Sequence, residues 1–152
     1  MRESPDFRMS EAERAAALRD VASLIRAVPD FPAPGILFRD ITPVLREPAA
    51  MAAALRLHLD AVADLAGSID RIVGVESRGF LFGMPIAHAL GVGFVPARKP
   101  GKLPAATVTQ AYALEYGEGT LHMHADAIAA GDRVLLVDDL LATGGTAGPP
   151  RG

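Results

Sequence analysis

At residues 133–146 the chain reads Arg-Val-Leu-Leu-Val-Asp-Asp-Leu-Leu-Ala-Thr-Gly-Gly-Thr. The apolar run at 134–137 predicts a short strand that is buried on both faces of a parallel sheet. Two carboxylates, Asp138 and Asp139, follow at its carboxyl end, where open α/β sheets bind their ligands. The turn at 143–146 then offers two hydroxyls and a glycine backbone that can approach an anion closely.

These groups together predict a site for a ribose 5-phosphate. The two carboxylates suit vicinal hydroxyls, and the backbone N–H groups of the small turn suit a phosphate. The alternative interpretation is a solvated acidic pair followed by an ordinary glycine turn. The length and order of the run favour the ligand site.

The composition excludes several other classes of protein. The chain has 152 residues, which suits one domain with a sizeable core, and its formal net charge of −3 gives no reason to expect nucleic-acid binding. No stretch approaches the ~18 uncharged apolar residues that a membrane span needs. The absence of cysteine excludes disulfides and thiolate sites, and the N-terminus lacks an apolar signal core. We therefore expect a cytoplasmic protein with no membrane anchor.

Helical patterns alternate with short apolar runs along the chain, which predicts a parallel α/β sheet flanked by helices. Residues 1–9 are expected to form a loose leader, residues 10–146 the domain and residues 147–152 an irregular tail. The expected helices lie at 10–29, 48–66 and 80–90, and the expected strands at 36–38, 69–75, 92–97 and 134–137, with a hairpin of 110–115 and 120–124.

A second turn at a strand end, Glu76-Ser77-Arg78-Gly79, opens one of these helices. The free N–H groups of a helix N-terminus and the guanidinium of Arg78 predict an anion site there. The alternative is that Arg78 only pairs with Glu76 across the turn.

A basic loop, Arg98-Lys99-Pro100-Gly101-Lys102, follows the next predicted strand. Its three cations and its Gly and Pro residues are typical of a loop that closes over a phosphate group and excludes water. The alternative is an ordinary solvated basic loop.

The motifs as a set resemble the adenine phosphoribosyltransferase family. The run at 133–146 is similar to the phosphoribosyl-pyrophosphate (PRPP) motif of type I phosphoribosyltransferases, and residues 30–45 resemble the N-terminal hood of the adenine family. The stretches at 76–80, 98–104 and 114–117 match in order and spacing. The resemblance implies the type I phosphoribosyltransferase fold, a central parallel sheet flanked by helices with a small hood.

The same resemblance implies an activity in purine salvage. The enzyme would transfer phosphoribosyl from PRPP to adenine and give AMP and pyrophosphate. Mg²⁺ would arrive with PRPP, with no ligand supplied directly by the protein, as is common for hard cations and polyphosphates. The family also implies a homodimer.

The resemblance assigns binding roles to matching positions of this chain. Leu37 and Arg39 would border adenine, and the peptide between Glu76 and Ser77 would be cis. Pyrophosphate would be bound by Ser77, Arg78, Lys102 and Arg98, of which Arg98 would reach into the site of a partner subunit.

The remaining roles fall on the strand end and the turn after it. Asp138 and Asp139 would hold the ribose hydroxyls, directly or through water on Mg²⁺. The 5-phosphate would be cradled by Ala142, Thr143, Gly144, Gly145 and Thr146.

Glu115 is the candidate catalytic residue. Displacement of pyrophosphate by a purine nitrogen needs no enzyme nucleophile, but it does need control of the proton on the purine. A carboxyl group beside the base can exchange that proton. The alternative is a glutamate at a strand end in solvent.

The ending of the chain departs from the family pattern. In the family a long helix and further strands follow the position of Thr146, whereas residues 147–152 read Ala-Gly-Pro-Pro-Arg-Gly. We expect a C-terminally truncated or alternatively spliced form, less active and less stable than a chain that continues past Thr146. The alternative to an active enzyme is a non-catalytic isoform or a regulator that binds purine or PRPP with the same fold.

Overall fold

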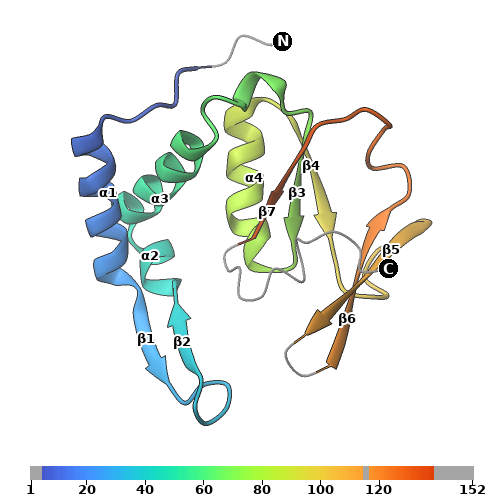
Figure 1. Cartoon of the computed structure of the whole chain (residues 1–152), viewed down its shortest axis with the longest axis horizontal. Helices are drawn as coiled ribbons and strands as arrows, with labels where there is room; N and C mark the ends of the chain where they lie inside the picture. Colours follow the sequence, from blue (N-terminus) through green and yellow to red (C-terminus); the bar gives the residue numbers. More distant parts are fainter. Residues whose placement is uncertain (1–4, 115–116, 139–152) are drawn as a thin grey trace. The chain divides into compact units, whose positions relative to one another are not determined.

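The computed structural model describes residues 5–114 and 117–138. Its helices and strands form two units, Ser4–Ala66 and a second one that begins at Gly67 (Figure 1). The N-terminal unit contains α1 (Glu11–Leu24), β1 (Arg26–Pro29), β2 (Leu37–Asp40), α2 (Thr42–Arg46) and α3 (Pro48–Ala61).

Helix α1 begins where the sequence predicts. The hydroxyl of Ser10 accepts a hydrogen bond from the N–H of Glu13 at 3.1 Å, and the Glu13 carboxylate accepts one from the N–H of Ser10 at 2.9 Å. This reciprocal pair satisfies two N–H groups that the helix itself leaves without partners.

The predicted end of this helix at Pro29 is wrong. Helix α1 ends at Leu24, and β1 follows it at once. Strand β1 pairs antiparallel with β2, so that Val28 lies opposite Phe38 and Pro29 opposite Leu37. The apolar spacing at 18–28 fits a helix, but pairing with a later segment fixes its last part as a strand.

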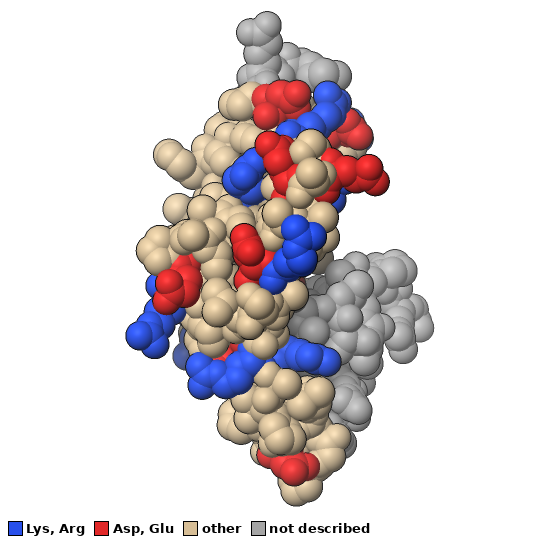
Figure 2. Space-filling view, turned by 90° about the vertical axis from the view of Figure 1, so that its left-hand side faces the viewer, with Lys and Arg blue, Asp and Glu red and all other residues tan. Residues whose placement is uncertain are grey.

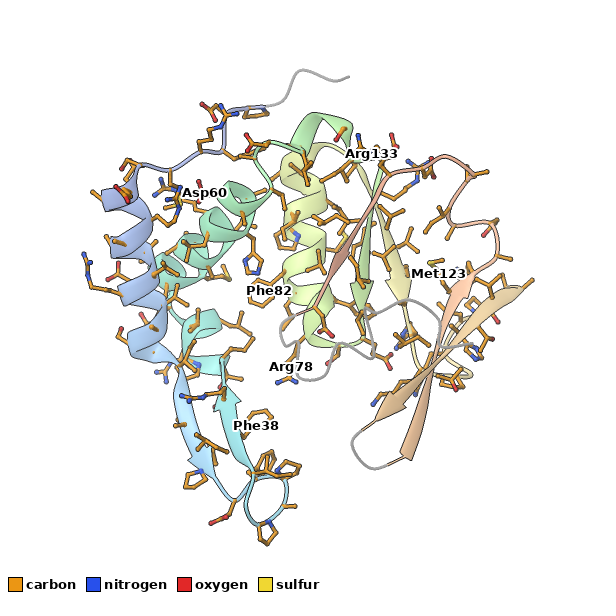
Figure 3. All side chains as sticks on the ribbon, viewed as in Figure 1. Phe38, Asp60, Arg78, Phe82, Met123 and Arg133 are labelled. Carbon is orange, nitrogen blue, oxygen red and sulfur yellow. The ribbon has the colours of Figure 1, made fainter. Side chains whose placement is uncertain are left out.

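Asp60 ties the start of the chain to α1 and α3 inside the N-terminal unit (Figure 3). Its carboxylate accepts hydrogen bonds from Arg14 Nε at 2.7 Å and from the N–H of Met9 at 2.8 Å. Met9, the last residue of the expected leader, is buried. The hydrogen bond from Arg14, followed by that from the Met9 N–H, holds the pKa of Asp60 below its ordinary value.

The surface charges show no face of one sign in the view of Figure 2, where Lys and Arg lie interspersed with Asp and Glu. Exposed pairs such as Arg8 with Asp64, at 2.7 Å, contribute little to stability individually. Among the helices in the described ranges, none has both the length and the apolar character that crossing a membrane requires.

The second unit is built around a parallel sheet with the order β4-β3-β7. A short 3-10 turn, η1 (Ala66–Ser68), leads into the sheet. The helix predicted at 48–66 is shorter than expected, because α3 ends at Ala61. The elements of this unit are β3 (Arg71–Val75), α4 (Arg78–Leu90), β4 (Gly93–Ala97), β5 (Thr107–Leu114), β6 (Gly117–His124) and β7 (Val134–Val137). The α/β class and the central parallel sheet are thus confirmed.

The sheet is covered differently on its two faces. Helix α4 packs on the face that carries Ile72 and Gly74, and Ile72 is fully buried there. The other face carries Val73 and Val95, against which Met123 of β6 packs (Figure 3). Alternating residues of β3 therefore serve two cores.

Strand β7 has the predicted bounds but not the predicted burial. Leu136 lies beside Val73 on the same face and is 40% exposed, and Val134 is 41% exposed. Only Val137, which faces α4, is buried. The prediction of burial on both faces is wrong because β7 lies at the edge of the described sheet. Met123 and its neighbours cover Val73 but leave Leu136 exposed.

The β5–β6 hairpin is longer than predicted. Its strands pair from Thr107 opposite His124 to Leu114 opposite Gly117. Residues 117–119, expected in the connecting loop, therefore belong to β6. The connection itself, residues 115–116, lies outside the described residues.

Candidate active site at the carboxyl edge of the sheet

Strands β3 and β7 are parallel neighbours, with Gly74 opposite Val137. The residues that follow them, the Glu76–Ser77 turn and Asp138, therefore lie at the same edge of the sheet. Figure 3 shows Arg78 at this edge, where the arrows of β3 and β7 end, and Arg133 at the opposite edge. The two strand ends at which the sequence predicts ligand-binding groups therefore lie at one edge of the sheet.

Helix α4 begins at the turn with a polar N-terminus. Ser77 is its exposed N-cap residue, and the Ser77 side chain makes no capping hydrogen bond. Arg78 is the first helical residue, and the peptide bond between Glu76 and Ser77 is cis, as the resemblance implies. The first N–H groups of a helix carry partial positive charge, so this end of α4 suits an anion.

Glu76 is held on three sides. Its N–H donates to the carbonyl of Ala97 at 2.9 Å, which continues the pairing of β3 with β4 by one residue. Its Oε1 accepts from Arg98 Nε at 2.7 Å and lies 2.6 Å from Arg98 Nη2, while Oε2 accepts from the N–H of Lys99 at 3.4 Å. The carboxylate of Glu76 thus joins the turn to the start of the basic loop.

These contacts set the charge state of Glu76. Burial, which leaves its side chain 12% exposed, acts to raise the pKa. The hydrogen bonds from Arg98 and from the N–H of Lys99 act in the opposite sense and outweigh it, so the pKa of Glu76 lies below its ordinary value of 4.5. Glu76 is therefore an anion paired with Arg98 at neutral pH.

Arg98 has further contacts within its own chain. Its guanidinium carbon lies 6.0 Å from the centre of the Phe80 ring, and the Phe80 ring packs edge-on against Phe94 at 5.7 Å. Its backbone exchanges two hydrogen bonds with His122 of β6, at 2.9 and 2.7 Å. These contacts hold Arg98 beside the turn at 76–79.

The other predicted site residues are distributed as follows. Lys102 is exposed in the loop after Arg98, and its carbonyl lies 3.5 Å from Arg98 Nη1. Asp138 is exposed and is the last described residue. The positions that lie outside the described residues are Glu115, Asp139, Ala142, Thr143, Gly144, Gly145 and Thr146.

The two residues expected to border adenine belong to the N-terminal unit. Leu37 and Arg39 are both exposed on β2. Because they are two residues apart on a strand, their side chains share one face. The Phe31 ring packs edge-on against Phe38 at the tip of the same hairpin, with a centroid distance of 5.1 Å.

Two residues with clear structural roles at this edge were missed from the sequence. The sequence offers Glu76 only as a partner of Arg78, whereas Arg98 binds it in the structure, and it indicates only a turn at Gly79. The available signal for Gly79 is a glycine at the entrance to the helical pattern of 80–90, since a glycine in a helix often has a packing reason.

We expect Glu76→Gln to lower the stability of the chain in a pH-dependent way. A group whose pKa is lowered by folding stabilises the protein above its unfolded pKa, and this contribution disappears as the pH falls through the folded pKa. At pH 7 the variant should lose about 1–2 kcal/mol, less than for a fully buried pair because Arg98 keeps 34% of its exposure.

Thermal melts of both proteins between pH 3 and pH 7 measure this effect. The difference in Tm should be largest at neutral pH and should close towards pH 3. Glu47→Gln is the matched control, since Glu47 is exposed and its side chain makes no capping hydrogen bond. A difference in Tm that stays constant with pH would show that the charge of Glu76 is not what matters.

Comparison with known proteins shows to which family the chain belongs. A Phosphoribosyl transferase domain matches residues 40–147. Adenine phosphoribosyltransferase of Synechococcus sp. (strain JA-3-3Ab) is 58% identical over 128 residues, which cover 84% of this chain and 73% of the relative. The chain belongs to the adenine phosphoribosyltransferase family.

Solved structures of the family agree with the fold. Adenine phosphoribosyltransferase from Rhodothermus marinus has a TM-score of 0.80 at 53% identity, with 88% of this chain and 74% of that chain covered. The enzyme from Saccharomyces cerevisiae, complexed with an imino-altritol bisphosphate and adenine, has a TM-score of 0.79 at 44% identity, with 88% and 77% covered. The type I phosphoribosyltransferase fold expected from the sequence is therefore confirmed.

Proposed function

We propose that the chain transfers the phosphoribosyl group of PRPP to adenine at the carboxyl edge of β3 and β7, giving AMP and pyrophosphate. One observation supports this location of the reaction. The N-terminus of α4, with Ser77 and Arg78, and the acidic end of β7, at Asp138, lie side by side in a member of the adenine phosphoribosyltransferase family. This reaction salvages free purine.

The two halves of the edge suit the two ends of PRPP. The positive end of α4 and the guanidinium of Arg78 bind the pyrophosphate, with Lys102 as a further cation. Asp138 and Asp139 accept hydrogen bonds from the ribose hydroxyls. The 5-phosphate is cradled by the turn at Ala142, Thr143, Gly144, Gly145 and Thr146.

The family resemblance supports a role in adenine binding for the N-terminal hairpin. Leu37 and Arg39, whose side chains share a face of β2, would border the base. The Saccharomyces cerevisiae relative was solved with adenine, which supports a base-binding role for this family.

The chemistry exchanges one bond at ribose C1 for another. The bond from C1 to the pyrophosphate oxygen breaks as N9 of adenine bonds to C1, and the proton of N9 passes to Glu115. The leaving oxygen gains negative charge, which the cationic groups at the start of α4 stabilise more strongly as it develops. Closure of the basic loop at 98–104 excludes water, which would otherwise attack the same carbon.

Mg²⁺ fits this site as a companion of PRPP. It prefers oxygen ligands, keeps several waters and is commonly bound through phosphates and one or two carboxylates. Within the described ranges no cluster of three or more acidic, histidine or cysteine side chains forms a protein cage for a metal ion. Oxygens of PRPP would hold the ion, Asp138 and Asp139 would contact it through water, and its charge would neutralise phosphate charge.

The family resemblance also supports a homodimer in the cytoplasm. In that assembly Arg98 has a second role, since its guanidinium, bound to Glu76 in one subunit, is 34% exposed and can contact the pyrophosphate of the partner subunit. Light scattering of the purified chain measures the mass, for which twice the 15.9 kDa of the chain is expected.

The choice of base tests the proposed function. We expect the chain to convert adenine, with PRPP and Mg²⁺, faster than hypoxanthine or guanine, because the hairpin and the stretch at 114–117 resemble the adenine branch of the family. Nucleotide formation is followed for each base under the same conditions. Faster turnover of hypoxanthine or guanine would place the chain in another branch, and the non-catalytic alternative, which the relatives do not favour, predicts no nucleotide from any base.

A further inference from the structure

The first turn of α4 lies unusually close to the end of β7. A Cβ atom built on Gly79 would lie 2.5 Å from the carbonyl oxygen of Val137 and 3.4 Å from Cα of Asp138. Both neighbours are backbone atoms, so no side-chain rotation can make room. Only glycine at position 79 allows α4 and β7 to approach this closely.

Two other glycines on the same side of the sheet have a different environment. A Cβ on Gly83 would lie 2.7 Å from the ring of Phe94, and one on Gly74 would lie 2.6 Å from the same ring. The shortest of these contacts involve a side chain, although a Cβ on Gly74 would also lie 3.0 Å from the carbonyl oxygen of Gly79. Gly83 lies one helical turn away from the edge. Gly83 therefore provides the packing of α4 on the sheet, without a direct contact to the strand end.

The contact at Gly79 joins the two parts of the site. Ser77 and Arg78 precede it on the α4 side, and Asp138 follows Val137 on the β7 side. The proposed function assigns the pyrophosphate to the first pair and the ribose hydroxyls to Asp138. These two groups are covalently linked in PRPP, so the spacing of their binding residues has to match the ligand.

We propose that Gly79 is a positioning residue that sets the distance between the pyrophosphate-binding turn and the ribose-binding end of β7; this inference rests on the proposed function. A methyl group at position 79 forces the two backbones apart by about half an ångström, because Cβ contacts below 3.0 Å essentially do not occur. At a site that orients a substrate, misplacement of the binding groups reduces catalytic efficiency steeply, and a shift of 1 Å can cost about 10²-fold.

The experiment compares Gly79→Ala with Gly83→Ala in the full chain. Both variants add one methyl group to the buried side of α4, and both are expected to lower Tm. Gly79→Ala should raise KM for PRPP by about tenfold, with KM for adenine within about twofold of wild type. Gly83→Ala should leave both KM values within about twofold of wild type.

The outcomes separate the inference from the function. An active wild-type chain whose Gly79→Ala variant keeps its KM for PRPP, or whose two variants raise it equally, overturns the role of Gly79 and leaves the function intact. A wild-type chain that forms no AMP overturns the function itself.

Amide hydrogen exchange in the unchanged protein tests the same coupling if Gly79→Ala does not fold. PRPP with Mg²⁺ should slow exchange at residues 77–80 and at Asp138 together, whereas adenine alone should protect neither segment. Protection confined to one of the two segments contradicts a ligand that spans the contact at Gly79.

Discussion

Replacing Glu115 by glutamine should lower kcat for AMP formation by about 10²–10⁴-fold, the usual contribution of proton transfer in a transition state. Glutamine keeps the size of the side chain but cannot take up a proton from adenine. KM for PRPP should stay within a few-fold of the wild-type value, since the proposed role of Glu115 concerns the base. Steady-state kinetics with PRPP and adenine varied separately measure both parameters.

Glu118→Gln is the matched control for this prediction. Glu118 lies three residues further along the same hairpin, at the start of β6. Its replacement should leave kcat within about twofold of wild type, because no role in the reaction is assigned to Glu118. A Glu115→Gln variant that weakens PRPP binding as strongly as it lowers kcat would remove the assigned role in proton transfer.

The pair Asp138→Asn and Asp139→Asn should chiefly weaken the binding of PRPP with Mg²⁺. Each substitution removes the charge from a carboxylate that, in the proposed function, accepts hydrogen bonds from the ribose hydroxyls or from water on Mg²⁺. Such charged hydrogen bonds contribute about 1.5–3 kcal/mol, so the Kd should rise by about 10–100-fold for each residue. Isothermal titration of PRPP in the presence of Mg²⁺ gives this Kd directly.

Asp132→Asn provides the control from the opposite edge of the same sheet. Asp132 accepts a hydrogen bond from the N–H of Ala129 at 2.9 Å and lies 4.0 Å from Arg71. Its loss should lower Tm but leave the Kd of PRPP unchanged. An equal loss of affinity in the Asp132 and Asp138 variants would mean that stability, and not ligand contact, explains both.

The parts of the fold that local sequence fixes were predicted well. Strand β7 has its predicted bounds because four apolar residues are followed at once by two carboxylates, which end the apolar run. Helix α4 ends at Leu90, as expected, because Gly91 adopts a left-handed conformation with φ of 70° that terminates helices. These signals depend on neighbours in the chain, which the sequence displays directly.

The errors concern contacts between distant segments. The apolar spacing at 18–28 fits a helix, but pairing with β2 makes residues 26–29 a strand. The partner of Glu76 was missed because Arg98 is 22 positions away, and only the register that sets Val75 opposite Ala97 brings the two together. The hydrophobic pattern specifies register only weakly between two strands that are apolar on both faces.

For the candidate site, too, the sequence predicts local features better than distances between segments. The sequence predicts that the turn at 76–79 and the end of β7 are both at the carboxyl edge, and the structure places Ser77, Arg78 and Asp138 there. The close approach at Gly79 could not be predicted, because it depends on the distance between a helix and a strand. The roles of Glu115, Asp139 and the turn at 142–146 stay predictions from the sequence.

The most direct test of the account is the stoichiometry of the reaction of the chain with adenine, PRPP and Mg²⁺. AMP and pyrophosphate, quantified in the same sample, should form in equal amounts, and both should depend on the presence of adenine. Release of pyrophosphate without AMP, or no reaction of either substrate, would contradict phosphoribosyl transfer to adenine by this chain.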